Sequence, residues 1–171
     1  VDKSKIIDGK RIQKGDLLVG FTSNGLHTNG YSLARKILLE KFKVTEHINE
    51  IDNILGVELL KIHKSYLELI TILKNSVDIK GLSHITGGGI IGNTSRIIPK
   101  GLEIKIHWGN WEMPSIFKLI QHTGNIANEE MHKVFNCGIG LIAVISKSEK
   151  IVAFQAAHDA HEHPLLIGEV I

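Results

Sequence analysis

The distribution of apolar residues along the chain predicts five short strands. The uninterrupted run GIGLIAVI, from Gly138 to Ile145, is typical of a strand that is buried on both faces. By contrast, apolar and polar residues alternate between Leu102 and Trp108, as they do in a strand with one exposed face. Shorter apolar runs bounded by turn residues predict three further strands, at Asp16–Thr22, Gly81–Ile85 and Leu165–Val170.

Apolar residues at a spacing of three or four predict helices between these strands. The longest such pattern covers Val57–Leu73, and a shorter one covers Tyr31–Leu39, with Thr28 or Asn29 as its N-terminal cap. The polar stretch Phe42–Gly56 predicts a surface connection. Four more helices are expected: one after Gly89 that ends by Pro99, one from Pro114 to about His122, one capped by Asn128, and one capped by Ser148 that ends near His158.

The interspersed helices and strands predict an α+β fold in which helices cover a mixed β-sheet. The sequence contains no internal repeat, no low-complexity tract and no linker with a shift in composition. We therefore expect residues 1–171 to form one domain.

Composition and charge exclude several classes of protein to which the chain could otherwise belong. Of the 171 residues, 43% are hydrophobic and 22% are charged, as in a packed globular domain rather than a disordered chain. The single cysteine, Cys137, excludes a disulfide scaffold and fits a reducing, cytoplasmic environment. Apolar runs fall far short of the ~20 residues that a membrane helix needs. With a net charge of +2 and no basic stripe, the chain has no electrostatic feature for nucleic acid.

The first stretch with candidate chemistry is GFTSNGLHTNGYSLAR, from Gly20 to Arg35. It predicts a strand, a small polar loop and a helix, and a loop of this kind at the end of a strand is a common ligand site. The alternative is an ordinary Asn/Gly turn that caps a helix. The hydrogen-bonding residues of the loop are Ser23, Asn24, His27, Thr28 and Asn29, with Gly25 and Gly30 at its turns.

The second stretch is HITGGGIIGN, from His84 to Asn93. Three glycines between a strand and a helix leave backbone N–H groups accessible, which suits a phosphate group. The stretch lacks the Gly-Lys-Ser/Thr of a Walker loop and the spacing of a dinucleotide fingerprint. His84, at the end of the predicted strand, is a candidate acid, base or hydrogen-bond donor. The alternative is a flexible glycine turn beside a packed histidine.

Three other features favour structural interpretations. Cys137 leads into a buried strand and has no basic neighbour in the sequence, so we interpret it as a core residue rather than a nucleophile. The histidine-rich segment His158–His163 lacks the ligand spacing of known metal sites and is interpreted as a solvated turn. We expect Trp108 and Trp111 to anchor a loop over the sheet.

Three stretches together resemble aminoimidazole ribonucleotide (AIR) synthetase, also called phosphoribosylformylglycinamidine cyclo-ligase. They are GFTSNGLHTNGYSLARKIL, HITGGGIIGN with Arg96 and Pro99, and WEMPSIFKLIQHTGNI followed by EEM and FNCGIG. The match covers most of Lys14–Ile145 and concerns only the C-terminal half of those enzymes. It implies the fold of the AIR synthetase C-terminal domain. The wider superfamily includes formylglycinamidine synthetase, selenophosphate synthetase, thiamine-phosphate kinase and a hydrogenase-maturation protein.

The resemblance implies an ATP-dependent ring closure in purine biosynthesis. ATP phosphorylates the formyl amide oxygen of formylglycinamidine ribonucleotide, the amidine nitrogen attacks the activated carbon, and phosphate leaves as the imidazole ring closes. By the same resemblance, His84 and His27 are catalytic and a further set of residues binds the substrate or its phosphate. That set is Ser23, Asn24, Gly25, Asn29, Gly87, Gly88, Gly89 and Asn93.

The chain departs from the family pattern at three places. Leu26 stands where the family usually has proline, and His132 stands where tyrosine is common. The region LLKIHKSY does not carry the family's Pro-Thr-Arg-Ile-Tyr stretch.

The resemblance also implies a missing N-terminal half, which in the family brings the acidic metal and nucleotide site and a dimer-forming sheet. The stretch VDKSKIIDG resembles the point where the C-terminal half begins. We therefore expect ATP and Mg²⁺ to bind mainly outside this chain, with no metal site in this half and no turnover by it alone. The expected partners are formylglycinamidine ribonucleotide, the chain's own N-terminal half and, at full length, a second copy in a homodimer.

Two other functions fit the same residues. One is a non-catalytic domain that binds a phosphorylated metabolite or a partner subunit. The other is a different ATP-dependent phosphoryl transfer within the superfamily.

Overall fold

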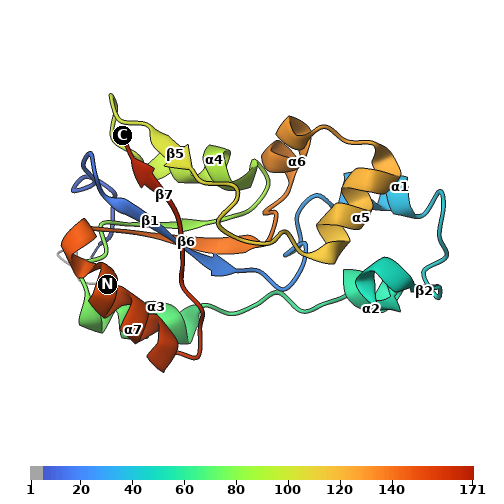
Figure 1. Ribbon diagram of the computed structural model, residues 1–171, viewed down its shortest axis with the longest axis horizontal. Coiled ribbons are helices and arrows are strands. Elements are labelled where there is room, and N and C mark those ends of the chain that lie inside the picture. The colour runs from blue at the N-terminus through green and yellow to red at the C-terminus, as the bar shows by residue number, and fades with distance from the viewer. Residues whose placement is uncertain (1–5) are drawn as a thin grey trace.

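A five-stranded sheet forms the centre of the protein (Figure 1). The structure, a computed structural model, describes residues 6–171, so the first residues of VDKSKIIDG lie outside the described part. The strands are arranged in the order β4-β6-β1-β7-β5, and each of the four pairings is antiparallel. Their bounds are β1 Leu17–Thr22, β4 Gly81–His84, β5 Ile104–Ile106, β6 Ile139–Ile145 and β7 Leu165–Val170.

The α+β class and the helix-covered sheet are confirmed, and each strand of the sheet lies within a stretch for which the sequence predicts one. All seven residues of β6 are buried, as its uninterrupted apolar run predicts. In β1, Val19 and Phe21 belong to the apolar cluster on one face of the sheet, whereas Leu18 belongs to the cluster on the other. Both central strands therefore have two buried faces.

Helices cover the two faces of the sheet unequally. On one face α3 (Leu67–Ser76) and α7 (Lys150–Asp159) pack against each other and against β1 and β6 (Figure 1). On the other face lies the shorter α4 (Gly89–Thr94), followed by a 3₁₀ turn at Ser95–Ile97. Within residues 6–171, no helix is long and apolar enough to cross a membrane.

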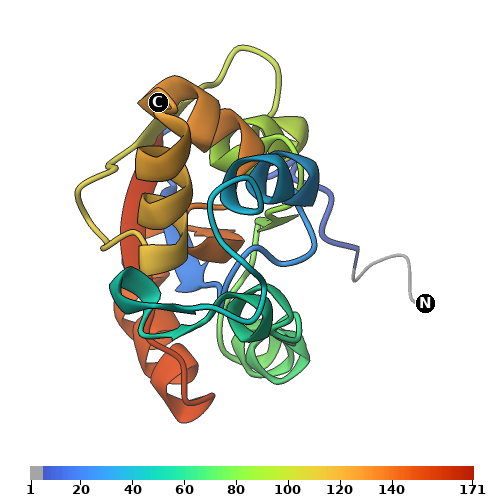
Figure 2. The same ribbon diagram turned by 90° about the vertical axis from the view of Figure 1, so that its right-hand side faces the viewer.

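A second group of helices lies beyond one end of the sheet and has an apolar cluster of its own. Figure 2 faces this end of the molecule, with α5 in golden yellow, α1 in blue and α2 in teal. The bounds of the helices are α1 Tyr31–Leu38, α2 Leu55–Leu59, α5 Ser115–Gly124 and α6 Asn128–Val134. The loop that leaves β1 crosses from the sheet, where Phe21 is buried, into this group, where Leu26 is buried.

The prediction of one long helix over Val57–Leu73 is wrong. The chain instead forms α2, a non-helical segment at residues 60–66, and then α3. Leu60 and Ile62, which the helical pattern places on a buried face, are 82% and 87% exposed. Tyr66 is buried and donates a hydrogen bond from its hydroxyl to the carbonyl of Thr22, which ties the segment to the end of β1.

The surface connection expected at Phe42–Gly56 also contains structure of its own. A small hairpin of β2 (His47–Ile48) and β3 (Asn53–Ile54) encloses a 3₁₀ turn at Asn49–Ile51. Ile48 of β2 and Leu55, which follows β3, are buried in the apolar cluster of the helical group.

The predicted helix caps differ from those of the structure by one or more residues. Gly30, in the left-handed conformation, precedes α1, and neither Thr28 nor Asn29 caps it. Their side chains have other partners, because Thr28 Oγ1 and Asn29 Nδ2 both donate to the carbonyl of His27. Asn128 is the first residue of α6, after Ala127 at the cap position. Ser148 lies within a 3₁₀ turn at Lys147–Glu149 that precedes α7.

Candidate functional site

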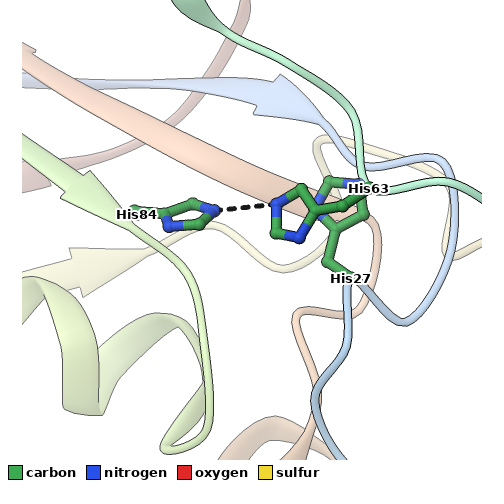
Figure 3. A group of neighbouring side chains, drawn as sticks. All are labelled: His27, His63 and His84. Carbon is green, nitrogen blue, oxygen red and sulfur yellow. Dashed lines mark hydrogen bonds between the residues drawn. The ribbon is translucent and has the colours of Figure 1, made fainter.

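Three imidazole rings from three separate segments of the chain lie together (Figure 3). His27 lies in the loop after β1, His63 in the segment between α2 and α3, and His84 at the end of β4. The rings of His27 and His63 stack with centroids 4.0 Å apart. Nε2 of His63 lies 3.0 Å from Nε2 of His84. One ring nitrogen from each residue can be chosen so that all lie within 4.8 Å of one another.

His27 is held in a strained and buried position. Its side chain is 3% exposed. The φ angles are 53° at His27 and 64° at Thr28, in the left-handed region that residues other than glycine rarely adopt. Burial is the main cause that lowers the pKa of His27 to about 4, and the neighbouring His63, His84 and Lys64 contribute to the same shift. The ring is therefore neutral at physiological pH.

The hydrogen bonds of Asn24 determine which nitrogen of His27 carries the proton. Nδ2 of Asn24 donates to the carbonyl of Ile62, so its Oδ1 faces Nε2 of His27, at 2.6 Å. The backbone N–H of Asn24 also points at this nitrogen, at 3.2 Å, but the shorter contact assigns the proton to Nε2. Nδ1 then carries a lone pair that is buried and has no hydrogen-bond partner in the described part of the chain.

His63 and His84 form the accessible side of the group. His63 is half-buried, and burial together with His84 lowers its pKa. His84 is exposed, so its ring faces solvent while one nitrogen contacts His63. The two nitrogens are 3.0 Å apart, so the N–H of one ring donates a hydrogen bond to the lone pair of the other.

Sequence reasoning missed His63, together with its neighbours Lys64 and Tyr66. Nζ of Lys64 lies 2.7 Å from Oε2 of Glu162, in the turn after α7. Burial raises the pKa of Tyr66, so its phenol keeps the proton that it donates to the carbonyl of Thr22. No local signal identifies these residues, since their apolar neighbours satisfy the spacing of a continuous helix.

The glycine loop is joined to the first loop by Asn29. The backbone N–H of Gly87 donates to Oδ1 of Asn29, at 2.9 Å, and the N–H of Gly89 donates to the carbonyl of Thr86. Gly88 lies between them, with the guanidinium of Arg96 beside it. Two of the three N–H groups expected to hold a phosphate therefore have partners within the protein.

Asn93, Ser23 and Gly25 hold the two loops from the inside. Asn93 is buried, and its amide donates to the carbonyl of Gly89 at 2.7 Å and to that of Thr86 at 3.1 Å. Ser23 donates to Oδ1 of Asn136, and the amide of Asn136 donates to the carbonyl of Gly25. Of the expected site residues, the structure thus places His27 and His84 against His63. Asn24 and Asn29 contact His27, and Gly87 contacts Asn29.

Cys137 is a core residue, as expected. It is 2% exposed, and burial raises the pKa of its thiol to about 12, so it carries no thiolate at neutral pH. Trp111 donates from Nε1 to the carbonyl of Cys137, and both tryptophans pack against the sheet cluster, as expected of loop anchors. His158 and His163 are exposed, with their ring centroids 5.9 Å apart.

The residues present do not fit Mg²⁺. In the part of the chain that the structure describes, the one group of three or more potential ligand side chains consists of the three histidines. Mg²⁺ takes oxygen ligands, usually carboxylates, phosphates and water, and none of these side chains supplies one.

A family profile described as "AIR synthase related protein, C-terminal domain" matches residues 13–171. The chain belongs to this family. Two curated relatives are phosphoribosylformylglycinamidine cyclo-ligases. The one from Pseudothermotoga lettingae is 40% identical over 100% of this chain and 50% of its own length. The one from Thermodesulfovibrio yellowstonii is 48% identical over 87% of this chain and 44% of its own length.

The AIR synthase C-terminal fold is also found in solved structures of more distant proteins. Escherichia coli HypE, a hydrogenase maturation protein, aligns over 95% of this chain and 46% of its own, with a TM-score of 0.56 and 17% identity. Thermotoga maritima PurL, solved with AMPPCP, aligns over 100% of this chain and 24% of its own, with a TM-score of 0.52 and 16% identity. The chain spans about half the length of the curated relatives it matches.

Proposed function

We propose that this chain is the substrate-side half of a phosphoribosylformylglycinamidine cyclo-ligase, which closes the imidazole ring of aminoimidazole ribonucleotide. The observation that carries the proposal is the meeting of His27 and His84 in one site, from two loops that are far apart in the sequence. Relatives at 40% and 48% identity that bear this enzyme name support it.

In the proposed reaction, the formyl amide oxygen of formylglycinamidine ribonucleotide receives the γ-phosphoryl group of ATP. The amidine nitrogen then forms a bond to the activated carbon, the carbon–oxygen bond breaks, and inorganic phosphate leaves. The attacking nitrogen must lose a proton as the ring becomes aromatic. A neutral imidazole within reach of that nitrogen is a suitable acceptor.

The two histidines have different parts in this proposal. His84 is exposed at the end of β4, so we assign it the contact with the substrate and the transfer of the proton. His27 is buried behind His63 and neutral, so we assign it the positioning of Asn24 and of the rings in front of it. At the glycine loop, we assign the binding of a substrate phosphate to the N–H of Gly88 and to the guanidinium of Arg96 beside it.

We place ATP and Mg²⁺ outside this chain as part of the same proposal. The absence of an oxygen-ligand group among residues 6–171 supports it, and so does the engagement of the Gly87 and Gly89 N–H groups with Asn29 and Thr86. The proposal further includes an N-terminal half as partner, a homodimer at full length, a cytoplasmic location and no turnover by this chain alone.

Calorimetric titration of the chain with formylglycinamidine ribonucleotide tests the proposal, with ATP–Mg²⁺ as a parallel ligand. We expect the ribonucleotide to bind and ATP–Mg²⁺ not to bind. His84→Ala should weaken ribonucleotide binding by about tenfold or more, because it removes a hydrogen-bonding contact. His122→Ala, at an exposed position near the end of α5, is the matched control and should bind normally.

A reconstitution assay tests the reaction itself. The chain is combined with the N-terminal half of the Pseudothermotoga lettingae cyclo-ligase, and phosphate release is followed with substrate and ATP. Turnover that requires both halves and is lost with His84→Ala supports the proposal. Binding of ATP–Mg²⁺ alone to this chain would instead assign it to another ATP-dependent member of the superfamily.

A further inference from the structure

We propose that His27, His63 and His84 form a binding site for a divalent transition-metal ion of the zinc class. Imidazole nitrogens are preferred ligands of Zn²⁺, Cu²⁺, Ni²⁺ and Fe²⁺ and poor ligands of Mg²⁺. The three rings converge from three segments of the chain, and their ligand atoms lie within 4.8 Å of one another. Figure 3 shows His63 between the other two rings, with its nitrogen directed toward that of His84.

The spacing of the nitrogens is close to that of a metal centre. A Zn–N bond of about 2.0–2.1 Å places the nitrogens of a tetrahedral site about 3.4 Å apart. The Nε2 atoms of His63 and His84 are 3.0 Å apart, so they need to separate by only a few tenths of an ångström. The third nitrogen, within 4.8 Å of these, needs a shift of about 1.4 Å or less relative to the other two.

The buried nitrogen of His27 is the second observation that points to a ligand. Its Nδ1 has no hydrogen-bond partner among the described residues, although the side chain is 3% exposed. A buried polar atom left without a partner costs about 1–3 kcal/mol. A metal ion that accepts its lone pair removes that cost.

His27 also has the outer contact that metal-binding histidines usually have. In such sites the ring nitrogen that does not bind the metal donates its proton to an oxygen, which fixes the tautomer and the ring orientation. Nε2 of His27 donates to Oδ1 of Asn24 at 2.6 Å, and Asn24 is itself fixed by the carbonyl of Ile62 at 2.7 Å. The lone pair of Nδ1 is therefore preset for a ligand.

Three imidazoles leave a fourth position of a tetrahedral ion free. Structural zinc sites use four protein ligands, whereas sites with three histidines hold water or a ligand oxygen in the fourth position. The neighbouring cation Lys64 is paired with Glu162, so its charge is offset. The exposure of His84 gives an incoming oxygen ligand access from solvent.

This proposal goes beyond the proposed function and is tested without substrate. The chain is freed of metal by dialysis against a chelator and titrated with CoCl₂ and then with ZnCl₂. We expect one Co²⁺ per chain with the intense visible absorption of a tetrahedral site, and displacement of Co²⁺ by Zn²⁺. His63→Ala and His84→Ala should each weaken binding by at least tenfold, and Asn24→Ala by about 10–100-fold.

His158→Ala is the matched control, since His158 is an exposed histidine of the other histidine-rich segment. It should bind Co²⁺ as the unchanged chain does. Full binding by His63→Ala and His84→Ala, or loss of binding by His158→Ala, would overturn the proposal. His63 is half-buried and His84 is exposed, so neither substitution removes a fully buried side chain. Circular dichroism and a melting curve check that each variant is folded before it is titrated. If one variant does not fold, the other decides the outcome.

Discussion

Ser23 donates its hydroxyl proton to the side-chain amide oxygen of Asn136, which lies 2.8 Å away and 113 residues further along the chain. The same oxygen accepts the N–H of Gly138, and the amide nitrogen of Asn136 donates to the carbonyl of Gly25. One buried side chain thus holds the loop that carries Asn24 and His27 against the start of β6. We infer that the histidine site depends on this contact, although the side-chain hydrogen bonds of Asn136 go to Ser23, Gly25 and Gly138 rather than to the three rings.

Asn136→Ala should reduce the free energy of unfolding by about 2–4 kcal/mol, because it leaves buried hydrogen-bonding groups of Ser23, Gly25 and Gly138 without partners. Urea denaturation followed by circular dichroism measures the change. Asn75→Ala, at an exposed position of α3, is the control and should stay within about 0.5 kcal/mol of the unchanged chain. Equal stability of the two variants would show that Asn136 does not hold the loop.

Gly89→Ala should destabilise the protein by about 2 kcal/mol or more. A Cβ at this position would lie only 1.8 Å from the carbonyl oxygen of His132, and the φ of +65° is itself unfavourable for alanine. Gly92→Ala, in the same short helix, has no atom within 4 Å of the added Cβ. It should leave stability unchanged or raise it by up to about 1 kcal/mol. Thermal melting of both variants checks the prediction, which a similar loss in both would contradict.

Lys80→Ala should cost about 3–5 kcal/mol, because it leaves the carboxylate of Asp16 buried without its partner. Nζ of Lys80 lies 2.6 Å from Oδ1 of Asp16, and their side chains are 11% and 3% exposed. The double variant Asp16→Asn, Lys80→Ala removes the charge as well and should recover part of the loss. Chemical denaturation compares the three proteins, with the exposed Lys74→Ala as a control near zero. A double variant less stable than Lys80→Ala would refute this account.

The stability of the protein should fall with rising pH above about 9 in part because of Cys137. Burial raises the pKa of its thiol from 9.0 to about 12 in the folded chain. Between these values the unfolded chain loses the thiol proton and the folded chain keeps it, so unfolding becomes easier by up to about 1.4 kcal/mol per pH unit. Cys137→Ala removes this contribution, and its unfolding free energy should decline less steeply. Parallel curves for the two proteins would contradict the prediction.

The strands were predictable because their apolar pattern and their burial agree. β6 is continuous in apolar residues and buried throughout, and the run from Asp16 to Thr22 becomes β1. The order of the strands does not follow from any local pattern, because it depends on pairings between residues as distant as Leu17 and Ile145.

The candidate site was predictable only in part, for a similar reason. His27 and His84 stand in stretches with unusual glycine content, and these stretches do meet in the fold. His63 stands in a stretch whose spacing satisfies a helix, and contacts with distant segments, such as those of Tyr66 with Thr22 and of Lys64 with Glu162, hold it in another conformation. Such contacts are tertiary, so they override local propensity without leaving a mark in the sequence around them.

The sheet order also affects how the chain folds. Leu17 of β1 pairs on one side with Ile145 and on the other with Glu169, so both neighbours of this strand are synthesised long after it. The apolar residues of β1 are therefore not covered by these strands until β6 and β7 have emerged. Contacts of such long range make folding slow and leave the nascent chain prone to aggregation in the meantime. A chaperone that shields the first strand during synthesis would therefore increase the yield of folded protein.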